Sequence, residues 1–185
     1  MSLARPRPSR VDAMRNRRHI VEVARGMLAE SGAVSMNTVA KLAGVGPATV
    51  YRHFPTREAL TLAVYRHDVQ RLLDLVGDEI AEHEPLDAFR VWFRRLAAYI
   101  RLKRGLGEAL HTAAMQDAIN ETYAPITAAV GRLLDACVAA GSMRPGLDPA
   151  DVLVLMSGLW QMGTGEPGAD QGDRLLELAI RGLHA

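Results

Sequence analysis

The spacing of apolar positions along this chain is typical of an all-α protein. Between Met14 and Ser31, apolar side chains recur every three or four residues, at Ile20, Val23, Ala24, Met27 and Leu28. This stripe predicts an amphipathic helix, and Gly32 is suited to end it. No segment alternates apolar and polar residues at every second position, so we expect no β-strands. The predicted fold class is all-α, with about nine helices.

The next predicted helices are bounded by residues that favour caps and turns: Asn37 or Thr38 to Leu42, about Pro47 to His53, and Thr56 to about Glu82. Gly44 supplies the turn between the first two, because glycine adopts positive φ without strain. Glu58 lies in the first turn of the third of these helices, where a negative charge is favourable.

The second half of the chain continues the helical pattern. Pro85 begins a helix that is interrupted near Gly105, and Pro125 is predicted to begin another, because proline fits the first turn of a helix better than its interior. A segment that is apolar on nearly every side extends from Asp148 to Met162, and a stripe from Leu175 to Leu183 marks the last helix.

Charge is distributed unevenly along the sequence. The 185 residues carry a net charge of +1, but residues 1–60 contain ten Lys or Arg against four acids, a net of +6, which leaves −5 for the remainder. A basic end on an acidic body is expected of a module that binds a polyanion such as DNA. The alternative is a disordered basic tail that only aids solubility.

Several classes of protein find little support in the sequence. Cys137 is the single cysteine, so no intrachain disulfide is expected, which suits a reducing compartment. No apolar run reaches the length of a membrane span, and no apolar segment follows the N-terminal arginines, so we expect a cytoplasmic protein without a membrane partner. The six histidines lack metal-ligand spacing, and GLGEAL at 105–110 lacks the context of a phosphate loop. We therefore expect no enzyme, no metal and no cofactor.

The segment 39–54 has the features of a helix-turn-helix. Ala40 allows two helices to approach closely, Gly44 makes the turn, and Val50 points back into the core. Helical periodicity then leaves the other side chains of the second helix largely exposed: Pro47, Ala48, Thr49, Tyr51, Arg52 and His53. Such a face suits contacts with phosphates and base edges in a major groove. The alternative is an ordinary turn between two core helices.

Residues 36–60 resemble the DNA-binding domain of TetR-type transcriptional regulators. The resemblance is carried by Met36-Asn37-Thr38-Val39-Ala40, Ala43-Gly44-Val45 and the run from Thr49 to Leu60 (TVYRHFPTREAL), within a match over about 17–64. It implies a homodimer with two recognition helices in successive major grooves. It also implies phosphate contacts from Thr38, Thr49, Tyr51, His53 and Arg57, and an approach to bases by Gly46, Pro47, Ala48 and Arg52.

This resemblance suggests three parts of the chain. Residues 1–13 form a flexible basic arm, 14–64 a three-helix DNA-binding domain, and 65–185 a helical domain for effector binding and dimerisation. The expected dimer interface uses the last two helices and contains Val152, Leu155, Met156, Leu159, Leu176, Ile180 and Leu183. The alternative is that the segment from Asp148 is the central helix of a monomeric bundle.

An effector pocket is expected between the middle helices. Its candidate residues are Trp92, Leu96, Tyr99, His111, Met115, Tyr123 and Trp160, each of which is also a plausible core residue. Cys137 is either a packed thiol or a redox sensor. The polar face of the helix after Pro85, with Arg90, Arg94 and Arg101, is either solvated or a site for an anionic effector.

The expected function is therefore a sequence-specific repressor that a small molecule releases from a palindromic operator. Two alternatives remain open from the sequence. One is an activator or global regulator of the same fold, and the other is a helical ligand-binding protein without operator specificity.

Overall fold

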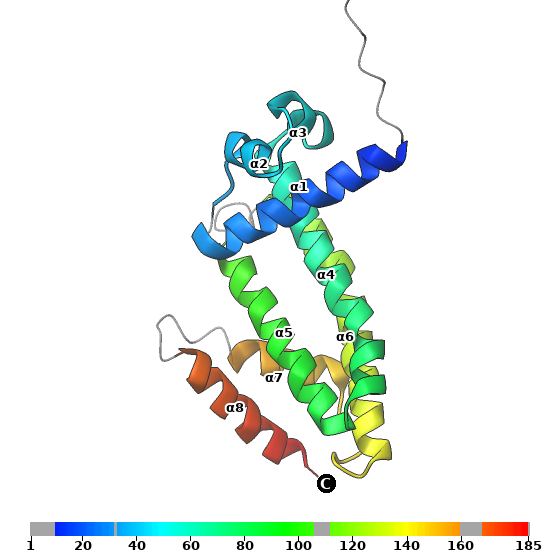
Figure 1. Cartoon of the computed structure of the whole chain (residues 1–185). Coiled ribbons are helices and arrows are strands. Elements are labelled where there is room, and N and C mark those ends of the chain that lie inside the picture. Colours follow the sequence, from blue (N-terminus) through cyan, green and yellow to red (C-terminus); the bar gives the residue numbers. More distant parts are fainter. Residues whose placement is uncertain (1–9, 32, 106–111, 160–167, 185) are drawn as a thin grey trace, which may run out of the picture.

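The computed structural model describes residues 10–31, 33–105, 112–159 and 168–184, and these ranges contain eight α-helices and no strand. The helices are α1 (Arg10–Ser31), α2 (Met36–Leu42), α3 (Pro47–His53), α4 (Arg57–Glu82), α5 (Pro85–Gly105), α6 (Ala113–Ala139), α7 (Pro149–Leu159) and α8 (Gly168–Leu183). Figure 1 shows their arrangement. None of the helices in these ranges combines the length and the apolar character needed to span a bilayer.

The first three helices and the start of α4 form a small head at one end of the molecule (Figure 1). In the head, α1 packs against α2, α3 and α4. Ile20, Val39, Val50 and Leu60 are completely buried between these helices. Because α4 has 26 residues, it extends well beyond the head and connects it to the rest of the chain.

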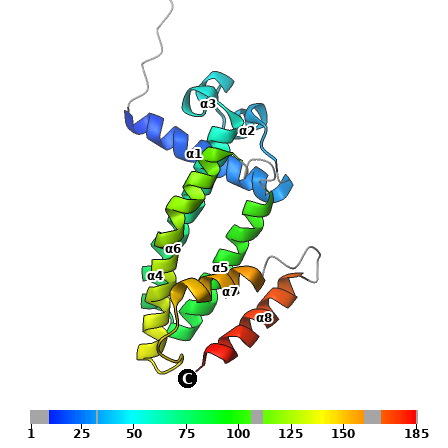
Figure 2. The same ribbon diagram turned by 180° about the vertical axis from the view of Figure 1, so that it is seen from behind.

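The body consists of α5 and α6 beside the long α4, with α7 packed against α5 and α6. In both views α8 lies at the end of the body far from α2 and α3, on the side of α5 away from α4 (Figures 1 and 2). The centre of the body is aromatic, with Phe89, Trp92 and Phe93 fully buried. The indole Nε1 of Trp92 donates a hydrogen bond of 2.9 Å to the carbonyl of Leu72, so this buried polar group is satisfied.

The start of α1 and the cap of α2 differ from the sequence-based expectation. Helix α1 begins at Arg10, four residues before the predicted start at Met14. Helix α2 is capped by Ser35, whose side chain accepts a hydrogen bond from the amide of Thr38, and neither Asn37 nor Thr38 is the cap. Ser35 can take this role because its backbone is extended, whereas Asn37 and Thr38 are already helical.

The predicted helix start at Pro125 is wrong, because α6 continues through this residue from Ala113 to Ala139. Proline removes one amide donor, which leaves the carbonyl of Glu121 without its helical partner. Glu121 and Pro125 both lie at the exposed surface, so water can hydrate that carbonyl, and apolar packing on the opposite face retains the helix. This continuity explains why the described residues contain eight helices where about nine were expected.

Candidate nucleic-acid interface

The turn between α2 and α3 has the geometry that the sequence predicts. Gly44 has φ of +65°, a conformation in which a side chain would be strained. The amide of Val45 donates to the carbonyl of Ala40 across the turn, at 3.0 Å. Helix α3 then begins with Pro47 in its first turn, after the extended Gly46. These features fix the direction in which α3 leaves the turn.

Two buried side chains anchor α3 on the head. Val50 is fully buried, and Phe54 directly after the helix is 2% exposed. The guanidinium carbon of Arg17 lies 5.0 Å from the centre of the Phe54 ring, in a cation–π contact that connects α1 to the end of α3. One side of this short helix is therefore held firmly by the core of the head.

The remaining side of α3 faces solvent. Gly46, Pro47 and Ala48 at its start are exposed, as are Tyr51 and Arg52. Tyr51 retains 47% of its accessible surface. Among the described residues, neither the Tyr51 hydroxyl nor the Arg52 guanidinium has a hydrogen-bond or ion-pair partner. This exposed surface of α3 is called the α3 edge below.

The other predicted DNA contacts come from α2, from α3 itself and from the start of α4. Thr38 at the start of α2 and Arg57 at the start of α4 are exposed, whereas Thr49 and His53 are half-buried. Between Arg10 and Leu60 there are eight Lys or Arg against four acids, a net charge of +4. All nine predicted DNA-contacting residues thus lie at least partly at the surface of a basic head.

The surroundings of His53 favour the neutral form of its imidazole. Partial burial lowers the pKa of its imidazole below the usual value, and the nearby guanidinium groups of Arg17 and Arg52 lower the pKa further. Its ring lies 6.2 Å from that of Phe54, so its position is partly set by the same anchor that holds α3. The imidazole can therefore act as a neutral hydrogen-bonding group toward a phosphate.

The start of α4 differs from the expected phosphate site. The side chain of Thr56 accepts a hydrogen bond from the amide of Ala59, at 3.1 Å. The carboxylate of Glu58 interacts with its own backbone amide and with the Thr56 hydroxyl, and these hydrogen bonds lower its pKa. The amides of Glu58 and Ala59 are therefore already engaged by side chains of this helix start, and the exposed Arg57 side chain remains the candidate group for a phosphate contact.

Comparison with known proteins identifies the family of both the head and the body. The family model for bacterial regulatory proteins of the tetR family matches residues 20–64. A second model, described as the C-terminal domain of SbtR-like transcriptional regulators, matches residues 84–185, more than half of the chain. The chain belongs to the TetR family of transcriptional regulators.

Two solved structures of TetR-family regulators are similar over nearly the whole chain. The regulator SCO0520 from Streptomyces coelicolor is 35% identical, with a TM-score of 0.80 over 91% of this chain and 98% of that one. A regulator from Mycobacterium vanbaalenii is 32% identical, with a TM-score of 0.77 over 96% and 100% of the two chains. These similarities extend the family assignment from the head to the body.

A curated relative is similar over part of the chain. The HTH-type transcriptional regulator SAB2452 from Staphylococcus aureus is 38% identical over 66 residues, which cover 35% of this chain and 36% of the relative. The match therefore spans about a third of that protein's length.

The predicted effector residues are distributed between core and surface of this TetR-family body. Trp92, Leu96 and Met115 are buried core residues, and Tyr123 is 49% exposed on α6. Tyr99 packs against Tyr65, with ring centres 5.8 Å apart. Burial raises the pKa of Tyr99, and the neighbouring Tyr65 raises it further. His111 and Trp160 lie outside the described residues.

A buried carboxylate in the same region was not predicted from the sequence. Asp68 on α4 is 7% exposed and forms an ion pair with Arg25 of α1, which joins the head to the body. Its other oxygen, Oδ2, has no hydrogen-bond partner among the described residues. The sequence could have indicated this burial, because Asp68 is four residues from both Val64 and Leu72, which lie on the buried stripe of α4.

The predicted interface residues require a correction. Five of the seven, Val152, Met156, Leu176, Ile180 and Leu183, are buried in the core of the single chain. Leu155 is exposed, and the side chain of Leu159 lies outside the described residues. The exposed apolar residues at this end are instead Val154, Leu155 and Leu178. When a helix is apolar on nearly every side, its sequence does not show which face packs against the rest of its own chain.

Contacts within the body bear on the two alternatives left open for the arginines of α5 and for Cys137. Arg90 donates hydrogen bonds to Glu177 of α8 and to Asp87, and Arg94 pairs with Asp173 of α8. These arginines therefore attach α8 to α5, while the side chain of Arg101 lies outside the described residues. Cys137 is completely buried, and its thiol donates to the carbonyl of Pro85, so it is a packed thiol whose pKa is raised by burial.

Proposed function

We propose that this TetR-family protein is a dimeric repressor that binds a palindromic operator and is released from it by a small-molecule effector. The observation that carries the proposal is the α3 edge, in which Tyr51 and Arg52 are exposed while Val50 beneath them is fully buried. A helix held rigidly from one side, with bare hydrogen-bonding groups on the other, is suited to enter a major groove.

Within this proposal the exposed groups have separate tasks. Arg52 is the candidate for a bidentate contact with a guanine, and Gly46, Pro47 and Ala48 are small enough to let α3 approach the bases closely. Thr38, Thr49, Tyr51, His53 and Arg57 position the head on phosphates. Catalysis has no part in this function, and the protein would act in the cytoplasm.

The proposed dimer is supported by the exposed apolar residues of α7 and α8. Regulators of this family bind DNA as dimers. Val154, Leu155 and Leu178 are 63%, 45% and 60% exposed, and such side chains gain stability when a second copy covers them. Two heads related by a two-fold axis can then read half-sites one helical turn apart, about 34–36 Å.

Release by an effector requires the body to influence the head. Helix α4 is shared by both, and the Arg25–Asp68 ion pair joins α1 of the head to α4 near the body. An effector that binds among the middle helices, where Tyr65 and Tyr99 pack together, would act by favouring a conformer with a different separation of the two heads. It must bind that conformer more tightly than the one that fits DNA.

A gel-shift experiment on the DNA that flanks the protein's own gene tests this proposal. We expect a discrete shifted band at moderate salt that survives an excess of unrelated competitor DNA. The reason is that such regulators bind their specific sites at least roughly 1,000-fold more tightly than unrelated DNA. If competitor removes all binding to every flanking fragment, the operator claim fails.

A further inference from the structure

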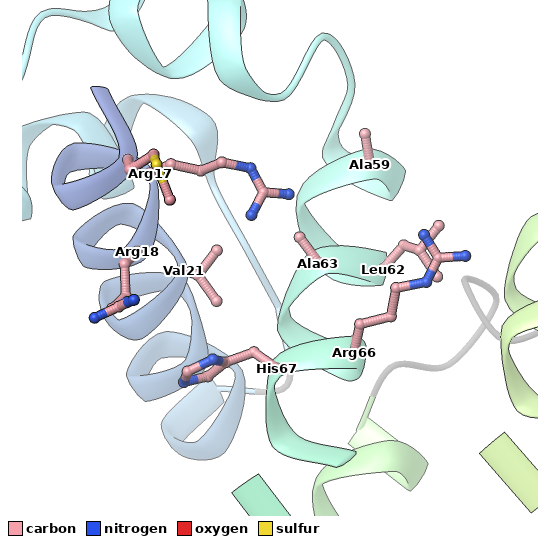
Figure 3. A pocket seen from close by; sticks show the side chains of 9 residues that line it. Arg17, Arg18, Val21, Ala59, Leu62, Ala63, Arg66 and His67 are labelled. Carbon is pink, nitrogen blue, oxygen red and sulfur yellow. The ribbon is translucent and has the colours of Figure 1, made fainter. Parts of the chain in front are cut away.

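A pocket of about 460 Å³ lies between the N-terminal halves of α1 and α4, beside the turn that joins α3 to α4 (Figure 3). Its lining includes three apolar residues, Met14, Val21 and Leu62, and three arginines, Arg17, Arg18 and Arg66. The volume is in the range of sites for small organic molecules, about 300–1,000 Å³. The pocket is separate from the middle helices in which the effector is proposed to bind.

The floor of this pocket is apolar. Val21 on α1 and Ala63 on α4 face each other across the gap between the helices (Figure 3). Met14 adds an apolar side chain that is 63% exposed, and Leu62 is half-buried on the α4 side. Covering these side chains with the apolar part of a ligand would remove them from water, which is favourable.

The rim of the pocket carries an excess of positive charge. Among the described residues Arg18 has no hydrogen-bond or ion-pair partner, and Arg17 contacts only the ring of Phe54. Arg66 has a long contact of 3.4 Å with Glu121, and both side chains are more than half exposed, so this pair is weak. At the lower edge, His67 is already paired with Glu22 at 2.7 Å. Within the part of the chain that the structure describes, no carboxylate therefore competes for the guanidinium groups of Arg17 and Arg18.

We propose that this pocket binds an amphiphilic monoanion, a small molecule with one carboxylate and a short apolar body. The carboxylate is held by Arg18 and Arg17, because guanidinium groups form strong charge-assisted hydrogen bonds with carboxylates. The apolar body covers Met14, Val21 and Leu62. A DNA backbone would satisfy the charge, but it has no apolar part to fill the floor, so a small molecule fits the lining better.

The position of the pocket gives such a ligand a route to the DNA-binding head. It occupies the joint between α1 and α4, next to the Arg25–Asp68 ion pair and the His67–Glu22 hydrogen bond that hold these helices together. The N-terminal half of α1 and α8 lie on opposite sides of the chain (Figures 1 and 2), so the proposed dimer leaves the pocket open. A bound anion would stabilise one angle between head and body.

Isothermal titration of decanoate into the full-length protein tests the proposal, with decyltrimethylammonium as the probe of opposite charge. We expect saturable binding of one decanoate per chain at this site and none of the cation. Arg18→Gln should weaken decanoate binding about tenfold or more, because it removes a charge-assisted contact. The fold should be unaffected, since Arg18 is exposed and has no partner to lose among the residues that the structure describes. Arg132→Gln, at an exposed arginine on α6, is the matched control and should bind as the wild type does.

A second variant locates the ligand independently of charge. Ala63→Leu places a larger side chain in the gap opposite Val21 and should also weaken decanoate binding, with unfolding curves measured to verify the fold. Absence of decanoate binding, or equal binding by wild type, Arg18→Gln and Ala63→Leu, would overturn the inference. So would a loss of DNA affinity in Arg18→Gln without decanoate binding, which would assign these arginines to the DNA backbone. The decanoate titrations do not depend on whether the gel shift succeeds, so failure of this inference and failure of the proposed function are distinguishable.

Discussion

The double replacement Tyr51→Ala/His53→Ala is expected to lower the affinity for operator DNA roughly 100-fold. Each side chain is proposed to donate a hydrogen bond to a phosphate, and hydrogen bonds to charged groups contribute about 1.5–3 kcal/mol each. The loss of two such contacts therefore amounts to about 3 kcal/mol or more, which is about two orders of magnitude in the dissociation constant. The measurement is fluorescence anisotropy with labelled operator DNA at one fixed salt concentration.

The fold should survive this double replacement. Tyr51 is 47% exposed and His53 is half-buried, whereas the anchors Val50 and Phe54 remain in place. The matched control is Tyr123→Ala, because Tyr123 on α6 is 49% exposed and lies outside the proposed interface. The control should bind operator DNA as the wild type does. Equal affinities for the double variant and the control would show that the α3 edge does not contact DNA.

Replacing Trp92 with alanine is expected to cost about 3–5 kcal/mol of unfolding free energy, the usual range for deleting a fully buried aromatic side chain. Trp92 is completely buried and packs edge-to-face on Phe93, with ring centres 5.2 Å apart. Its indole also satisfies the carbonyl of Leu72, which would be left without that partner. The measurement is urea unfolding followed by circular dichroism, which does not depend on tryptophan fluorescence.

This experiment also separates a core residue from the wall of an effector cavity. The control is Trp92→Phe, which retains much of the buried ring and loses the hydrogen bond to Leu72, at an expected cost of about 1–3 kcal/mol. If Trp92→Ala costs less than about 1.5 kcal/mol, the ring faces open space and the assignment of Trp92 to the packed core is wrong.

The head was predictable because its signals are local. Gly44 marks the turn, Val50 the buried side of α3 and Thr56 the cap of α4, and each acts on residues within a few positions of itself. The exposure of Tyr51 and Arg52 follows from the same periodicity once Val50 is placed inward. The cap of α2 was misplaced by a few residues, because Ser35 and Asn37 are both good caps and the sequence does not show which one is extended.

The body was less predictable because its decisive contacts join distant residues. Arg90 and Glu177 are 87 positions apart, and Arg25 and Asp68 are 43 apart, so neither pairing is visible in the sequence. The burial of Met156 and Ile180 depends in the same way on how α7 and α8 pack against the rest of the chain. Periodicity indicates that a helix has an apolar face, but tertiary packing decides whether the chain or a second copy covers it.

The pocket between α1 and α4 depends on this kind of distant contact as well. Arg18 and Arg66 belong to helices that are separate in sequence, and nothing local suggests that they share a rim. A solvated arginine face is the ordinary expectation for such residues. Here, however, the pocket beside Val21 offers space for a ligand, and Arg18 has no acidic partner among the described residues. These two observations distinguish the arginines of the rim from an ordinary solvated face.

Photo-crosslinking from the start of α3 shows whether this helix lies against the bases of DNA. A crosslinker attached to an Ala48→Cys variant would stand on the exposed α3 edge, whereas the native Cys137 is completely buried and should remain unlabelled. The same reagent on a Tyr123→Cys variant, at an exposed position of α6 away from the α3 edge, is the control. We expect crosslinks from position 48 to bases of the operator and none from position 123. Equal yields from both positions, or no crosslink to DNA from position 48, would contradict this expectation.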